Sequence, residues 1–287
     1  MIPFMKMHGN GNDFILIDNR DGGFSSSDLS ALARRACRRR SSLGADGILV
    51  VEKASQADFA MRLFNADGSE GEMCGNGARC IARYAFEKRI AGSDQSFSTL
   101  AGIMRAVVDP PFVDLAMGEV PLAEGWFNRS LSVAGRTFPA SFLWVGVPHA
   151  VLFPSGELSR EEMAGIGRTL RSDFLLFPEG ANINFVTEAP EGAIYSVTYE
   201  RGVEDLTDSC GTGSTASAAA WLLRGETPSA PVSLDVINPG GVNRVFLDFA
   251  PDGASFQASL RGRTVIVAEG TLFEKDESLN VIIERER

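Results

Sequence analysis

The sequence Cys74-Gly75-Asn76-Gly77-Ala78-Arg79 recurs in form, about half the chain later, as Cys210-Gly211-Thr212-Gly213-Ser214-Thr215. Each stretch runs into a segment of helical composition, 78–88 in the first case and 214–224 in the second. A helix start leaves backbone N–H groups unpaired and carries a positive field, which attracts anions and lowers the pKa of a thiol beside it. Two such turns facing each other would hold one carboxylate between two thiols.

The segments around these turns follow the same order twice, strands before the cysteine turn and strands after it. This order predicts two similar halves with a site in the cleft between them. In the first half we expect a helix over 28–40 and strands over 4–8, 14–18, 47–52, 59–64, 96–101, 103–109 and 112–117. In the second half we expect a helix over 159–170, capped by Ser159 with Glu162 three residues later, and strands over 131–134, 141–146, 150–153, 182–187, 195–200, 232–237, 244–249, 255–260 and 264–268.

The composition is that of a globular protein, with 44% hydrophobic and 22% charged residues in 287. A formal net charge of −10 argues against nucleic acid or an anionic membrane as the main partner. The basic run over 34–40 is interpreted as the solvated face of a helix. We find no secretory signal and no apolar run long enough to span a membrane, and four cysteines do not make a disulfide scaffold, so we expect a cytoplasmic protein with reduced thiols.

Cys74 and Cys210 are the main candidates for chemistry, whereas Cys37 and Cys80 fit apolar helical patterns and are interpreted as buried. A zinc site would need closer cysteine pairs or histidine clusters, and a cysteine hydrolase would use only one of the two motifs. The glycine turns match neither a dinucleotide fingerprint nor a Walker loop, and none of the four lysines lies in a glycine-rich motif that would suggest pyridoxal phosphate. Chemistry with two thiols and no cofactor or metal remains.

Two thiols are what inversion of a carbon centre requires. A single base returns the proton to the face from which it came, whereas a thiolate on one face and a thiol on the other invert the centre. Because the α-proton of an amino acid is a weak acid, the developing carbanion needs stabilisation, which two helix starts aimed at the carboxylate would supply.

Other polar residues in turns and at strand ends are candidates for substrate recognition. His149 follows a turn and is interpreted as an assistant to a thiol. Glu200 and Arg201 end a strand just before Cys210 and could bind an ammonium and a carboxylate. Four amides in glycine or turn contexts could recognise a zwitterion or could be ordinary turn formers: Asn12, Asn65, Asn76 and Asn182.

Several segments together resemble the diaminopimelate epimerase family. They are Met7-His8-Gly9-Asn10-Gly11-Asn12-Asp13-Phe14, Phe64-Asn65-Ala66-Asp67-Gly68-Ser69-Glu70, Pro148-His149, Ala181-Asn182, Tyr199-Glu200-Arg201-Gly202 and the two cysteine motifs. The resemblance implies an α+β fold of two pseudo-symmetric, barrel-like halves, each wrapped around a central helix, with the last strand returning to the first half. The expected division is 1–116 plus 264–287 for the half with Cys74, and 117–263 for the half with Cys210.

The resemblance also implies an activity, the interconversion of LL- and meso-diaminopimelate in lysine biosynthesis, without cofactor and in a protein that often dimerises. It implies a role for each site residue. Cys74 and Cys210 would be the acid and base, supported by His149 and Glu200. The substrate-binding residues would be Gly75, Asn76, Gly211 and Thr212 for the reacting carboxylate, Asn12 and Glu200 for its amino group, and Asn65, Asn182 and Arg201 for the distal end.

Two departures from the family pattern concern the distal end of the substrate. Val147 replaces the asparagine that the family usually has two residues before the histidine, and the loop from Glu200 to Cys210 is one residue longer. A racemase of another amino acid, such as histidine, is therefore the alternative enzyme. A binding protein without catalysis would not need both thiols.

Overall fold

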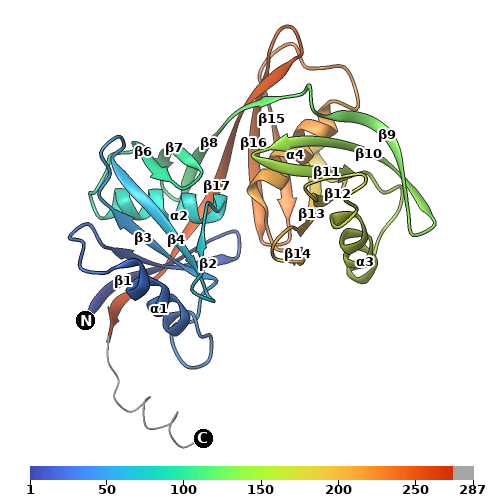
Figure 1. The fold of residues 1–287 in the computed structure, drawn as a ribbon. Coiled ribbons are helices and arrows are strands. Elements are labelled where there is room, and N and C mark those ends of the chain that lie inside the picture. Colours follow the sequence, from blue (N-terminus) through green and yellow to red (C-terminus); the bar gives the residue numbers. More distant parts are fainter. Residues whose placement is uncertain (274–287) are drawn as a thin grey trace, which may run out of the picture.

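The computed structural model describes residues 1–273, which form two lobes joined by long strands (Figure 1). Each lobe is built around one central helix. The first contains β1 (Ile2–Gly9), β2 (Asn12–Asp18), α1 (Ser26–Ala36), β3 (Gly47–Glu52), β4 (Phe59–Asn65), β5 (Glu70–Gly71), α2 (Gly75–Glu87), β6 (Asp94–Thr99), β7 (Gly102–Asp109) and β8 (Phe112–Pro121). The second contains β9 (Trp126–Val133), β10 (Arg136–Val145), β11 (Val147–Leu152), α3 (Arg160–Arg171), β12 (Asn182–Glu188), β13 (Ile194–Glu200), β14 (Asp205–Thr207), α4 (Gly211–Leu222), β15 (Val232–Asn238), β16 (Gly241–Phe249) and β17 (Ser255–Leu272).

The two lobes repeat one topology, which confirms the predicted pseudo-symmetric α+β fold. In the first, β2 and β3 pair in parallel around α1, and β4 and β6 pair in parallel around α2. In the second, β11 and β12 pair in parallel around α3, and β13 and β15 pair in parallel around α4. Each central helix is thus the crossover between two parallel strands, and the sheet curls around it.

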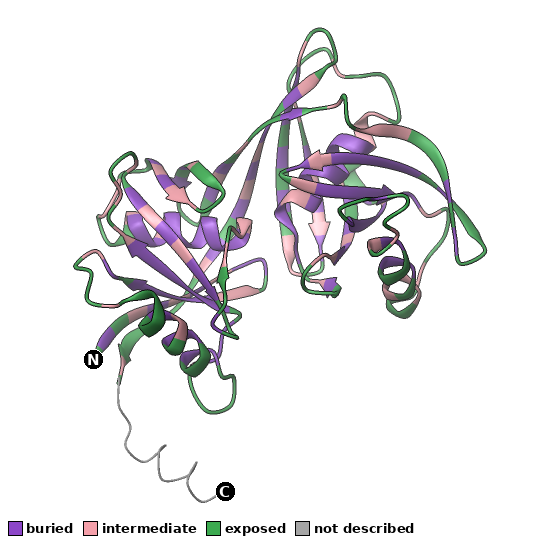
Figure 2. Ribbon diagram, viewed as in Figure 1, coloured by how far each residue is buried: buried purple, intermediate pink, exposed green. Residues whose placement is uncertain are grey.

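Burial follows from composition. The helix α4 is rich in alanine and serine, and most residues of both α4 and α2 are buried (Figure 2). Small side chains let the surrounding strands approach the α4 backbone closely. A separate apolar core surrounds each of the two helices, so each lobe has its own packed centre.

The strand β17 joins the lobes. It pairs with β16 of the second lobe through residues 256–262, with β8 through residues 255–263, and with β1 of the first lobe through residues 264–272. The sequence predicts two shorter strands in this region, over 255–260 and 264–268. The expected division at 116/117 and 263/264 stays a prediction; β8 and β17 both run across it, and residues 274–287 lie outside the described residues.

Other boundaries also differ from those expected. Helix α1 begins after Ser25, which accepts a hydrogen bond from the Asp28 backbone N–H, and Asp28 is the first-turn acid of this capping box. The helix ends at Ala36, so that of the basic run only Arg34 and Arg35 lie on it, and Arg39 instead binds Asp13 and Asp46. The capping box of Ser159 and Glu162 at α3 is confirmed.

Within residues 1–273, no helix has both the length and the apolar character that crossing a membrane would require.

Candidate functional site

The starts of α2 and α4 face each other between the two lobes. Cys74 and Cys210 are the N-cap residues, both with extended backbone, so each thiol stands directly before its helix. A Cβ atom placed on Gly75 would lie 4.0 Å from the Cα of Gly211, and the converse distance is also 4.0 Å. Glycine at both positions lets the two helix starts, each with unpaired backbone N–H groups, approach this closely.

Cys74 is half-buried and belongs to a chain of polar contacts in the first lobe. Its Sγ donates to Oδ1 of Asn12 at 3.3 Å. The amide of Asn12 donates to Asp46 at 2.5 Å, and Asp46 in turn accepts from Arg39 at 2.6 Å. Arg39, from the basic run over 34–40, thus orients Asn12 through Asp46, and Asn12 in turn orients the thiol of Cys74.

Cys210 is buried and has a different set of partners. Its Sγ accepts the backbone N–H of Gly213 at 3.3 Å and lies 3.4 Å from the hydroxyl of Thr212. The backbone of the same turn is held by Ser214, whose hydroxyl donates to the carbonyl of Cys210 at 2.9 Å. These contacts fix the thiol over the first turn of α4.

Glu200 ends β13 and acts electrostatically on both thiols. Burial raises the pKa of Cys74 and of Cys210, and the nearby carboxylate of Glu200 raises both further. Burial also raises the pKa of Glu200 itself, against a hydrogen bond from Thr207. The backbone N–H groups at each helix start act in the opposite direction and lower the thiol pKa. Glu200 is therefore the acidic group common to both thiols.

Direct hydrogen bonds link the lobes beside the thiols. The amide of Asn76 on α2 donates to the carbonyl of Ser209 at 3.1 Å, one residue before Cys210. The amide of Asn10 donates to Asn243 at 2.8 Å and lies 3.4 Å from the hydroxyl of Ser209. All of these polar residues except Ser209, which is 9% exposed, have at most 5% of their surface exposed, so this junction excludes water.

His149 lies on β11, fully buried, in register with Asn182 on β12. Its Nδ1 contacts the amide of Asn184 at 3.2 Å, and its Nε2 has no hydrogen-bond partner among residues 1–273. Burial lowers its pKa to about 3, so the ring is neutral. Asn184 also receives a hydrogen bond from Thr198 and packs on Gly213 in the first turn of α4, so the described contacts connect His149 to the second helix start through Asn184.

The residues expected at the distal end divide into two groups. Asn182 accepts the backbone N–H of Arg201 at 2.7 Å, and the guanidinium of Arg201 donates to the carbonyl of Glu179 at 2.8 Å. These two lie near His149, whose pKa the charge of Arg201 helps to lower. Asn65, at the end of β4, is exposed and donates to Ser69 within its own turn; within residues 1–273, no hydrogen bond joins it to the other group.

Sequence reasoning missed three residues that position others: Asp46, Asn184 and Ser209. Asn184 could have been found, because it lies two residues after Asn182 and alternate residues of a strand share a face. Asp46 and Ser209 have no such local signal, since each depends on contacts with residues far away in sequence.

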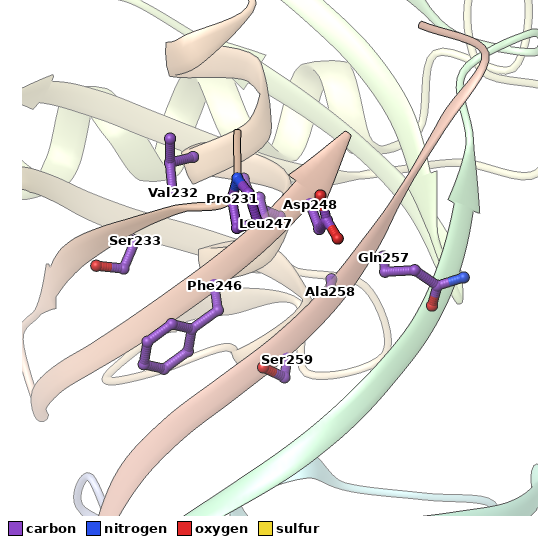
Figure 3. A pocket seen from close by; sticks show the side chains of 9 residues that line it. All are labelled: Pro231, Val232, Ser233, Phe246, Leu247, Asp248, Gln257, Ala258 and Ser259. Atoms are coloured by element: carbon purple, nitrogen blue, oxygen red, sulfur yellow. The ribbon is translucent and has the colours of Figure 1, made fainter. Parts of the chain in front are cut away.

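A separate hollow of about 330 Å³ lies on β15, β16 and β17 (Figure 3). It is lined by apolar and hydroxyl side chains with one amide, Gln257, and one carboxylate, Asp248, and contains neither thiol. Within residues 1–273, no three histidine, cysteine or acidic side chains are grouped closely enough to hold a metal ion. The described chemistry therefore concentrates at the two helix starts.

Comparison with known proteins shows close relatives along almost the whole chain. A family model described as diaminopimelate epimerase matches residues 4–122 and 142–246. The diaminopimelate epimerase of Hydrogenobaculum sp. (strain Y04AAS1) is 37% identical, over 93% of this chain and 97% of the relative. That of Aquifex aeolicus (strain VF5) is 35% identical, over 96% and 99%.

Solved structures with the same fold are more distant in sequence. A Bacillus anthracis phenazine biosynthesis protein of the PhzF family superposes with a TM-score of 0.72 at 15% identity, covering 95% of this chain and 99% of that one. A probable proline racemase from Agrobacterium radiobacter K84 superposes with a TM-score of 0.69 at 16% identity, covering 95% and 93%. At these identities the likeness is one of fold alone.

Proposed function

The chain belongs to the diaminopimelate epimerase family, and from that premise we propose that it is an isomerase that interconverts LL- and meso-diaminopimelate in lysine biosynthesis. The observation that carries the proposal is the pair of cysteines capping two helices whose first residues, Gly75 and Gly211, approach each other. In this proposal one carboxylate binds where the two helix starts meet, and one thiol serves each face of the α-carbon. The proposed chemistry needs no cofactor.

In the proposed mechanism, the substrate carboxylate accepts hydrogen bonds from the backbone N–H groups of Gly75, Asn76, Gly211 and Thr212. One thiol, as thiolate, removes the α-proton, and the other returns a proton to the opposite face. The two helix starts stabilise the negative charge that develops on the carboxylate in the transition state. Because either cysteine can begin as the base, the reaction runs in both directions.

Thiolate formation has to be coupled to substrate binding, because burial and Glu200 both raise the pKa of the thiols. We assign the α-ammonium group of the substrate to Glu200 and Asn12. Its positive charge would offset the negative charge of Glu200. This removes the repulsion between the carboxylate and a thiolate and lets one thiol ionise. The thiolate fraction of the free enzyme is thus small and rises when the substrate is in place.

For the distal end of the substrate we propose Asn65, Asn182 and Arg201, with His149 as a neutral group that supports the second helix start through Asn184. We also propose, from the net charge, that nucleic acid is not a partner. A cytoplasmic location would keep the four free cysteines reduced. A homodimer, which light scattering of the purified protein would detect, completes the proposal.

The test is proton NMR of the reduced protein in D2O with LL-diaminopimelate. Inversion with solvent exchange removes the α-proton signal, and the Cys74→Ala and Cys210→Ala variants should each abolish inversion. Turnover close to that of the wild type in either variant would contradict the two-base mechanism.

One observation favours a second candidate, a racemase of another amino acid. Val147 is an apolar, half-buried residue at the start of β11, two residues before His149, where the family pattern has an amide. The same NMR measurement with L-histidine and other L-amino acids separates the two candidates. Exchange with one of these and none with diaminopimelate would keep the mechanism and reassign the substrate.

A further inference from the structure

The guanidinium of Arg79 is an uncompensated positive charge inside the protein. Arg79 lies on the second turn of α2 and is 0% exposed, and its Nε and Nη1 atoms have no hydrogen-bond partner among the residues that the structure describes. Within the described part of the chain, no carboxylate forms an ion pair with it. Arginine keeps its proton at any ordinary pH, so the charge is permanent.

This placement opposes stability. Burying an unpaired charge is costly, and a cation close to a helix N-terminus also meets the positive end of the helix dipole. Room is nevertheless kept for it, since a Cβ atom on Gly262 of β17 would lie 2.5 Å from the Nε of Arg79. The buried charge of Arg79 costs stability, yet the protein keeps a space fitted to it. This indicates that Arg79 is required for something other than folding.

Among residues 1–273, the one hydrogen bond of Arg79 connects it to the thiol site through Asn76. Nη2 donates to Oδ1 of Asn76 at 2.8 Å, and the amide of Asn76 donates to the carbonyl of Ser209 at 3.1 Å, next to Cys210. Arg79 thereby fixes which way the Asn76 amide points, because only its oxygen can accept from a guanidinium. The amide nitrogen is then left to hold the turn before the second thiol.

Its charge also reaches the first thiol. Arg79 lowers the pKa of Cys74, in opposition to Glu200, which raises it. Two other ionisable groups interact with this pair: the buried thiol of Cys80 interacts with Arg79, and the thiol of Cys210 interacts with Cys74. Among these groups, Arg79 is the one cation.

We propose that Arg79 is a positioning residue of the two-thiol site: its buried charge supports the anions gathered at the two helix starts, and its bond to Asn76 holds the Cys210 turn against α2. The proposal rests on the function proposed above and deepens it. Two anions balance the charge of Arg79: the thiolate and the carboxylate of the bound amino acid. This explains why no carboxylate of residues 1–273 forms an ion pair with Arg79.

The test measures the reactivity of Cys74 without turnover. In full-length protein carrying Cys210→Ser, we compare alkylation of Cys74 by iodoacetamide at pH 8 in three further variants, with peptide mass identifying the modified residue. Arg79→Met removes the charge and Arg79→Lys keeps it. Arg83→Met is the matched control on the same helix, where the arginine pairs with Glu87 near the surface.

Loss of a nearby charge shifts a thiol pKa by about one unit, so we expect Arg79→Met to slow alkylation about tenfold. Arg79→Lys and Arg83→Met should remain within about twofold of the parent protein. In the enzyme with both cysteines, Arg79→Met should also raise KM and lower kcat, because both carboxylate binding and the Cys210 turn depend on it.

Alkylation of folded Arg79→Met at the parental rate would overturn the proposal, as would equal slowing in Arg79→Lys. Thermal unfolding monitors the fold, and Arg79→Gln, which keeps a donor for Asn76, replaces the Met variant if that one does not fold. Because alkylation requires no substrate, the result stands apart from the NMR test: failure of proton exchange would refute the proposed function while leaving the effect of the charge measured.

Discussion

Glu200 lies where its carboxylate raises the pKa of Cys74 and of Cys210 together. We therefore predict opposite effects of Glu200→Gln on two measurements. Removing the charge lowers both thiol pKa values, so alkylation of the free enzyme at pH 8 should speed up severalfold. Epimerisation should fall by at least about a hundredfold, because the ammonium group loses its partner. Glu204→Gln, an exposed neighbour, should change neither; slower alkylation in Glu200→Gln would contradict the assignment.

His149 provides a prediction about stability and pH. Its pKa is about 3 in the folded protein and near 6.5 when unfolded, so the unfolded chain gains a proton first as the pH falls. Stability due to this group is complete above pH 6.5 and is lost progressively toward pH 3, by up to about 5 kcal/mol. His149→Gln should flatten the free energy of unfolding against pH between 6 and 4, as measured by urea denaturation.

A steep acid loss in His149→Gln, equal to that of the wild type, would assign the loss to carboxylates instead, such as Asp13, whose pKa Arg39 and Lys6 hold below its usual value.

At the scale of the element, the first turn of α4 separates binding from folding. A Cβ atom on Gly211 would make ordinary contacts at 3.8 Å or more, whereas one on Gly213 would lie 2.6 Å from Asn184 and 2.8 Å from Thr198. Gly211→Ala should keep the melting temperature and raise KM about tenfold or more, because the methyl group enters the carboxylate space. Gly213→Ala should destabilise by about 1–3 kcal/mol, as thermal unfolding would measure.

The reverse result, with Gly211→Ala unstable and Gly213→Ala normal in stability, would contradict the described packing. Gly165→Ala on α3, where a Cβ atom meets nothing within 4 Å, is the control for substitution inside a helix.

The same elements show how far the sequence could predict the structure. The cysteine turns and the order of strands predicted both central helices and the two-lobed fold, because a glycine-rich helix start and a buried strand are local patterns. Strands β5 and β14 were missed, since two or three residues carry no periodicity. Arg39 was placed on a helix face because its run is basic, while its real partners, Asp13 and Asp46, lie on other segments.

For the whole molecule, the thiols lie on different lobes, which are held together by β17, by the Asn76–Ser209 bond and by the contacts of Asn10 with Ser209 and Asn243. Thiols on opposite faces of one α-carbon are close enough to join once the substrate is absent and the lobes adjust. We predict that mild oxidation cross-links Cys74 with Cys210, abolishes activity, and is reversed by a reductant.

Such a bond would close a loop of more than a hundred residues, which constrains the unfolded chain by about 5 kcal/mol on the chain-entropy model. The oxidised protein should therefore melt at a higher temperature than the reduced one, while Cys74→Ala and Cys210→Ala should show no shift on oxidation. Cys80→Ser, which changes a buried thiol of α2, should behave as the wild type. Peptide mapping that found Cys74 joined to Cys37 or Cys80, or no bond after both thiols had been oxidised, would mean that the two lobes do not bring their cysteines together, and a two-base mechanism could not operate between them.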